Sequence, residues 1–135
     1  MALIEWTPAL SVGVAELDNQ HKKLIDIINR FNDAMKSGKG AAVLAVALKE
    51  VADYTVYHFG AEERQLQAIG YSGLLKQKTE HKIFVDKLKS LQKELDAGKM
   101  MLSIEFMAFL KTWLTSHIAV NDKQYMPALN AKGIH

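Results

Sequence analysis

One stretch of the sequence places a histidine and a glutamate where a core is expected. His58 and Glu62 are four residues apart, about 40° around a helix of about 3.6 residues per turn, so both can reach one metal ion. A carboxylate in a core must be paired or must bind a metal. The simpler interpretation of this pair alone is a weak contact on the helix surface. The helical stripe that carries the pair also contains Leu44, Leu48, Val51 and Thr55.

Apolar residues recur at helical spacing in four segments, which indicates four amphipathic helices. We expect the first to begin with Asp18 as its N-cap, the second to span residues 41–67, and the third to carry a stripe that begins at Leu74. Because short turns separate the segments, the sequence predicts an all-α, up-down-up-down four-helix bundle. Residues 1–135 should form one domain with a short C-terminal tail. An irregular N-terminal arm should pack on this domain through Trp6, Leu10 and Val12.

The fourth helical segment begins regularly and then loosens. It should start near Met101 and loosen around residues 120–122, and Pro127 should stop regular helix soon afterwards. His117 and Asp122 are five residues apart, which is about 140° around a regular helix. They can therefore reach the same point only if the helix ends or bulges there.

Polar side chains of metal-binding type fall on the apolar stripes of all four predicted helices. Taken singly, a histidine such as His21 would more often be a satisfied core or capping group. Several core imidazoles and two core carboxylates are hard to satisfy by mutual hydrogen bonds, whereas a metal centre satisfies all of them. The number of donors favours two metals, with the two carboxylates available to bridge them. The full set is His21, His58, Glu62, Gln77, His81, His117 and Asp122.

Composition narrows the chemistry of such a centre and of its surroundings. The chain has no cysteine, which leaves nitrogen and oxygen donors and suits iron, manganese or a His/carboxylate zinc. The 17 basic and 15 acidic residues are interspersed, so we expect neither nucleic-acid binding nor membrane insertion. The N-terminus lacks the basic start and apolar run of a secretory signal, and we expect a cytoplasmic protein.

The combined motifs resemble the hemerythrin family, specifically its single-domain bacterial type. The resemblance covers nearly the whole chain, and its combined spacing is far more specific than any one piece. The matching residues are Ser11-Val12-Gly13-Val14, Leu17-Asp18-Asn19-Gln20-His21-Lys22-Lys23-Leu24, His58-Phe59 with Glu62-Glu63, His81 with Phe84, and His117-Ile118 with Asp122 and Tyr125.

The resemblance implies a centre of two non-haem iron ions joined by an oxo or hydroxo bridge. Glu62 and Asp122 would bridge the two irons. One iron, with a position open to O2, would be held by His21 and His58. The other, normally saturated iron would be held by His81 and His117.

One position departs from the family pattern. Where the third helix normally carries His-x-x-x-His, this chain has Gln77-Lys78-Thr79-Glu80-His81. Three outcomes are open: Gln77 binds iron through its amide oxygen, water takes that place, or the iron is partly lost. A fourth interpretation is a glutamine that is simply hydrogen-bonded in the core.

Helix geometry predicts an apolar O2 pocket beside the open iron. A lining that is poor in proton donors suits reversible O2 binding, because a nearby acid would protonate the bound, reduced oxygen and cause it to leave as peroxide. The same residues would also serve as ordinary core. The expected lining residues are Leu24, Phe59, Trp113, Leu114 and Ile118.

The resemblance thus predicts reversible O2 binding, with transport or delivery to an O2-consuming enzyme, by a monomer. We expect an oxygen-binding protein rather than an enzyme, with at most weak peroxidase-like activity. The alternatives are a di-iron oxidase or peroxidase, and a metal-depleted bundle in which the departure at Gln77 weakens the site.

Overall fold

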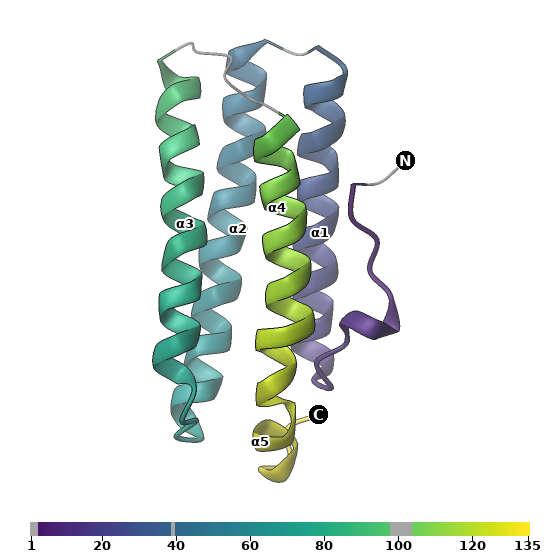
Figure 1. Ribbon diagram of the computed structural model, residues 1–135, viewed down its shortest axis with the longest axis vertical. Helices are drawn as coiled ribbons and strands as arrows, with labels where there is room; N and C mark the ends of the chain where they lie inside the picture. Colours follow the sequence, from purple (N-terminus) through teal and green to yellow (C-terminus); the bar gives the residue numbers. More distant parts are fainter. Residues whose placement is uncertain (1–2, 39, 98–103) are drawn as a thin grey trace.

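Four long helices form an antiparallel bundle in the computed structural model, which describes residues 3–38, 40–97 and 104–135 (Figure 1). The helices are α1 (Ala15–Lys36), α2 (Ala41–Ala68), α3 (Leu74–Asp96) and α4 (Ile104–Ser116). Successive helices run in opposite directions, and no strand occurs within the described ranges. The predicted all-α, up-down-up-down bundle is confirmed.

The apolar stripes of the helices meet along the axis of the bundle. Burying a leucine or phenylalanine side chain stabilises the fold by roughly 1.5–3 kcal/mol relative to leaving it exposed. The stripes predicted from helical spacing are therefore the core. Its fully buried members include Leu24, Ile28, Phe31, Leu44, Leu48, Leu66, Phe84, Leu88, Leu110 and Leu114.

An N-terminal arm packs along α1, as predicted (Figure 1). Its backbone is fixed by Asn29, whose amide nitrogen donates to the Ile4 carbonyl at 2.8 Å and whose oxygen accepts from the Ile4 N–H at 2.9 Å. Leu10 and Val12 are buried, and Trp6 lies against the core with the Lys22 ammonium 4.3 Å from its ring. A 3-10 turn, η1 (Pro8–Leu10), lies in the middle of this arm.

The start of α1 differs from the prediction. Val14, not Asp18, is the N-cap, and Asp18 lies within the first turn of the helix. Its carboxylate reaches back to accept from the Val12 N–H at 2.8 Å and from the Ser11 hydroxyl at 2.6 Å. A carboxylate in the first turn is favourable there, so the signal marked the correct helix end but not the capping position.

The C-terminal segment contains a widened turn followed by a short helix. A π-helical turn, η2 (His117–Asn121), follows α4 and leads through a 3-10 turn, η3 (Asp122–Tyr125), into α5 (Met126–Ala131). The loosening around residues 120–122 is confirmed. Pro127, however, lies in the first turn of α5, where its missing N–H costs nothing, so it begins a helix rather than stopping one. The expected start of the fourth helix near Met101 lies outside the described residues.

No helix in the described parts of the chain has the length and apolar character needed to cross a bilayer.

Gly13, in the N-terminal arm, packs closely against Met126 of the C-terminal segment. Replacing this glycine tests the contact between the two segments. Its φ is +71°, and an added Cβ would lie 2.7 Å from Met126 Cγ. We expect Gly13→Ala to lower the free energy of unfolding by about 2–4 kcal/mol, from backbone strain and overpacking together. Urea denaturation followed by circular dichroism measures this.

Gly38→Ala is the matched control. Gly38 has a φ of +69°, but nothing lies within 4 Å of the added Cβ, so only the strain of about 1–2 kcal/mol should appear. Equal losses in the two variants would contradict the packing contribution assigned to Met126.

Candidate metal centre

His58 and Glu62 face the interior of the bundle from α2. Their side chains are 1% and 0% exposed, and His58 Nε2 lies 3.0 Å from Glu62 Oε2. Consecutive turns of a regular helix place both groups on one line, as the four-residue spacing predicted. Burial at this level excludes the alternative of a weak surface contact.

Four histidines, from α1, α2, α3 and the turn η2 that follows α4, come together next to Glu62 in two pairs. We call His21 and His58 the first pair, and His81 and His117 the second pair. The ring centroids of the first pair are 4.5 Å apart, and Nε2 atoms of the second pair are 3.1 Å apart. All four side chains are buried.

Glu62 connects the two pairs through its two oxygens. Oε2 lies 3.0 Å from Nε2 of both His21 and His58, whereas Oε1 lies 3.2 Å from His81 Nε2. One carboxylate oxygen thus faces each pair. Such an arrangement suits a carboxylate that bridges two cations.

Asp122 makes the second connection in the same way. Its Oδ1 lies 2.9 Å from His117 Nε2, and its Oδ2 lies 3.2 Å from His21 Nε2. The π-helical turn makes this contact possible, because the Asp122 N–H bonds to the His117 carbonyl five residues earlier. The predicted need for a bulge between His117 and Asp122 is confirmed.

Two sets of potential metal ligands result from this geometry. One set is His21, His58 and Glu62, and the other is Glu62, His81, His117 and Asp122. Within each set, ligand atoms lie within 4.8 Å of one another. Glu62 belongs to both sets, and Asp122 Oδ2 also lies 3.2 Å from His21 Nε2 of the first set, so the described residues provide two adjacent potential metal positions that share both carboxylates.

The charges at the site are strongly coupled. Burial alone would lower the pKa of His21, but hydrogen bonds with Asp122 and Glu62 outweigh it and raise this pKa to about 10. Burial would raise the pKa of Glu62, and the nearby imidazoles of His58, His21 and His81 hold it well below its usual range. Positive charge beside both carboxylates is therefore required, either as protons on imidazoles or as metal ions.

Unpaired polar atoms support the interpretation as a metal centre. Glu62 Oε1 and Asp122 Oδ2 are buried and make no well-aligned hydrogen bond, although each lies 3.2 Å from an imidazole Nε2. Buried acceptors of this kind are costly unless a cation or water satisfies them. The donor set holds only imidazole nitrogens and carboxylate oxygens, which suits a borderline or hard cation such as iron. These residues fit the di-iron group that the resemblance implied.

Three polar side chains support the ligands from outside, and the sequence analysis gave them no role. Gln20 Oε1 lies 2.7 Å from His58 Nδ1, and Glu63 Oε2 lies 2.8 Å from His81 Nδ1. The Tyr125 hydroxyl donates to Glu62 Oε2 at 3.1 Å. Partners of this kind fix the tautomer and orientation of ligating imidazoles. The available signal was their position: Gln20 and Glu63 each lie next to a ligand in the sequence.

Gln77 is buried beside Asp122. Its amide nitrogen donates to Asp122 Oδ1 at 2.8 Å, and its side chain is 3% exposed. The inward direction predicted from the third helical stripe is confirmed.

The residues expected to line an O2 pocket lie in two places. Leu24, Leu114 and Ile118 are buried apolar residues of the core. Phe59 instead stacks on His81, with ring centroids 3.7 Å apart and planes 2° apart. Trp113 stacks on His117 at 4.5 Å and 12°. The two aromatic residues thus contact the second pair, and the Phe59 ring centroid also lies 5.8 Å from that of His58 in the first pair, beside which the sequence analysis placed the pocket.

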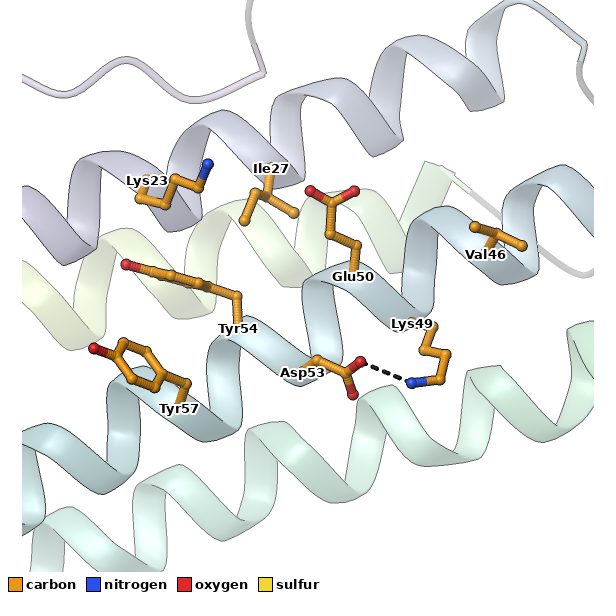
Figure 2. Close-up of a pocket in the computed structure, with 8 residues that line it drawn as sticks. All are labelled: Lys23, Ile27, Val46, Lys49, Glu50, Asp53, Tyr54 and Tyr57. Atoms are coloured by element: carbon orange, nitrogen blue, oxygen red, sulfur yellow. Dashed lines mark hydrogen bonds and ion pairs between the residues drawn. The ribbon is translucent and has the colours of Figure 1, made fainter.

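A surface groove between α1 and α2 lies apart from this site. Figure 2 shows its lining side chains, among them Tyr54 and Tyr57 from α2 and Lys23 and Ile27 from α1. None of the lining residues belongs to either histidine pair or to the two central carboxylates. The buried cluster, rather than this groove, carries the chemistry described above.

Comparisons with known proteins agree with this geometry. Residues 12–129 match the family model of the hemerythrin HHE cation binding domain. The chain is 35% identical over 132 residues to a bacteriohemerythrin of Methylococcus capsulatus, covering 97% of this chain and 100% of that protein. It is 36% identical over 124 residues to a hemerythrin-like protein of Naegleria gruberi, covering 92% of each chain.

A solved structure supports the same assignment. A crystal structure of wild-type hemerythrin superimposes with a TM-score of 0.88 at 34% identity, over 95% of this chain and 98% of that one. Family model, sequence identity and fold therefore agree with the ligand geometry, and the chain belongs to the hemerythrin family.

Proposed function

We propose that this protein binds O2 reversibly at a non-haem di-iron centre and carries or delivers it. The observation that carries the proposal is that Glu62 and Asp122 each direct one oxygen at the first pair and the other at the second pair. Similarity to bacteriohemerythrins supports the same function. The family model spans residues 12–129, which supports a single domain.

In this proposal the four histidines and two carboxylates hold the iron ions. His21 and His58 would hold one metal, His81 and His117 would hold the other, and Glu62 and Asp122 would bind both, together with an oxo or hydroxo group. When bound, such a centre supplies electrons and an open coordination position for O2. Gln20 and Glu63 orient imidazoles through their Nδ1 atoms.

The apolar surroundings favour reversible binding over turnover. Leu24, Leu114 and Ile118 are buried and offer no acidic proton. Burial raises the pKa of Tyr125 well above its ordinary value, so this hydroxyl keeps its proton and donates a hydrogen bond to Glu62. A carrier needs such a lining, because proton donation to bound oxygen would favour its release in reduced form.

Iron content and oxygenation test the proposal directly. We expect the iron-loaded protein to hold two irons per chain and to show an absorption spectrum that changes reversibly between air and vacuum. Glu62→Gln removes the charge of a bridging ligand and should lower iron affinity by roughly tenfold or more.

Glu50→Gln is the control for this variant. Glu50 lies on α2, and its exposed side chain forms a surface ion pair with Arg30 at 3.3 Å. Its replacement should leave iron content unchanged. Wild-type protein without iron, or with iron but no reversible spectral change, would contradict the proposal.

Metal loading should release protons, because a ligating imidazole must be neutral. In the metal-free protein the pKa of His21 is raised to about 10, so His21 holds a proton at pH 8, and the pKa of His81 is raised by its contacts with Glu62 and Glu63. We expect Zn2+ or Fe2+ binding at pH 8 to release about one proton more from wild type than from His21→Ala. A pH-indicator dye measures the difference.

The sign of the effect follows from the raised pKa. Above pH 10 His21 has already lost its proton in the metal-free protein, so the difference between the two proteins should vanish there. An unchanged proton yield at pH 8 on removal of His21 would contradict this assignment.

Restoring the family pattern at position 77 should strengthen the centre. We expect Gln77→His to retain iron better than wild type and to slow oxidation of the O2 complex, because imidazole is a stronger metal ligand than the amide or water that would otherwise take that place. Iron content after chelator challenge and the rate of spectral decay in air measure the two effects. Equal values in both proteins would count against a role for residue 77.

A further inference from the structure

The hydrogen bond of Gln77 determines which end of its amide faces the centre. The amide nitrogen lies 2.8 Å from Asp122 Oδ1, an oxygen that also lies 2.9 Å from His117 Nε2. A carboxylate oxygen only accepts hydrogen bonds, so the amide must present its N–H there. An amide nitrogen that donates in this way is not a metal ligand. Gln77 therefore acts at this site as a hydrogen-bond donor.

If Gln77 is not a ligand, the protein offers the same number of metal-binding groups at the first pair as at the second pair. The second pair adds two imidazoles to the oxygens of Glu62 and Asp122, and the first pair adds two imidazoles to the same carboxylates. The family pattern has a third imidazole at the position of Gln77. A metal at the second pair therefore has one protein donor fewer than that pattern supplies.

Surface grooves lie next to the second pair. A groove of about 470 Å³ between α2 and α3 is lined by residues that include His81, Phe59 and Glu63. Another, of about 360 Å³ between α3 and α4, is lined by residues that include His117 and Trp113. Both volumes greatly exceed that of a three-atom ligand. Each of these grooves therefore reaches one imidazole of the second pair, and both imidazoles are themselves buried.

The margin of the α2–α3 groove favours anions. Three lysines line it, Lys78, Lys82 and Lys89, against the two carboxylates of Glu63 and Asp86. Lys82 pairs with Asp86 at 2.6 Å, and Glu63 is engaged with His81 Nδ1. Lys78 and Lys89 therefore leave a local excess of positive charge that raises the concentration of small anions in this groove, next to His81.

We propose that the metal position of the second pair takes a small anion, which accepts a hydrogen bond from the amide nitrogen of Gln77. The proposal rests on the proposed di-iron centre and adds a second exogenous ligand site, on the opposite side from the open iron that the family resemblance implied. The chemical class is a small monoanion with a terminal donor atom, such as azide. Asp122 and the anion would share the two N–H groups of the amide.

Azide titration of the ferric, iron-loaded protein tests the proposal. Calorimetry and the azide charge-transfer absorption should give two azides per pair of irons in wild type. Gln77→His fills the second side with an imidazole and should take one. Gln77→Leu keeps the ligand place but loses the donor, so it should still take two, with the second bound roughly tenfold or more weakly.

The matched control is Gln92→Leu. Gln92 lies on the same helix, about 22 Å further along α3, and bonds to Ala45 and Asp96 rather than to the centre. It should bind two azides with wild-type affinity.

Iron analysis of the same samples separates the two proposals. Two irons, reversible oxygenation and a single azide in wild type would overturn the second ligand site and leave the proposed function intact. Two azides in Gln77→His would overturn it as well, because the second azide would then not depend on residue 77. Fewer than two irons per chain would overturn the proposed function and this inference with it.

Discussion

Two carboxylates without access to water set the conditions for the rest of the molecule. Glu62 and Asp122 are both 0% exposed, and each would be strongly destabilising without nearby positive charge. The chain surrounds them with four imidazoles, one from each of α1, α2 and α3 and one from the π-helical turn after α4. The charge can be carried by protons or by metals, so the same cluster stabilises the fold and creates the metal positions.

The widened turn after α4 connects this cluster to the periphery of the fold. It brings Asp122 beside His117, and the chain then continues through Tyr125, whose hydroxyl donates to Glu62. The following helix, α5, packs near the N-terminal arm, since an added Cβ on Gly13 would meet Met126. The arm is also held to α1, because the Asp18 carboxylate accepts a hydrogen bond from the Val12 N–H. The arm thus supports the segment that positions Asp122, although none of its described residues belongs to either set of potential metal ligands.

The sequence predicted which side chains of each helix point inward better than it predicted which side chains of other helices they contact. Periodicity identified the polar residues that point inward, and the five-residue interval from His117 to Asp122 indicated the bulge. It did not predict that Phe59 would stack on His81, because helical spacing fixes a direction and not the partner that a long ring reaches. The effect of Pro127 was predicted wrongly because proline is unfavourable inside a helix but well tolerated in its first turn, and the sequence alone did not show which of the two applied.

Equal donor counts leave the surroundings to distinguish the two metal positions. His21 lies in the core beside Leu24, and its Nδ1 is a buried atom without a hydrogen-bond partner. His81 is covered by Phe59 on one face and held by Glu63, which is itself 26% exposed and lines a groove. A hydrogen bond from Nδ1 to a carboxylate makes an imidazole a stronger donor. His81 therefore combines an imidazole supported by a carboxylate with closer contact to solvent than His21 has, and these properties, rather than the number of ligands, would make two bound metals inequivalent.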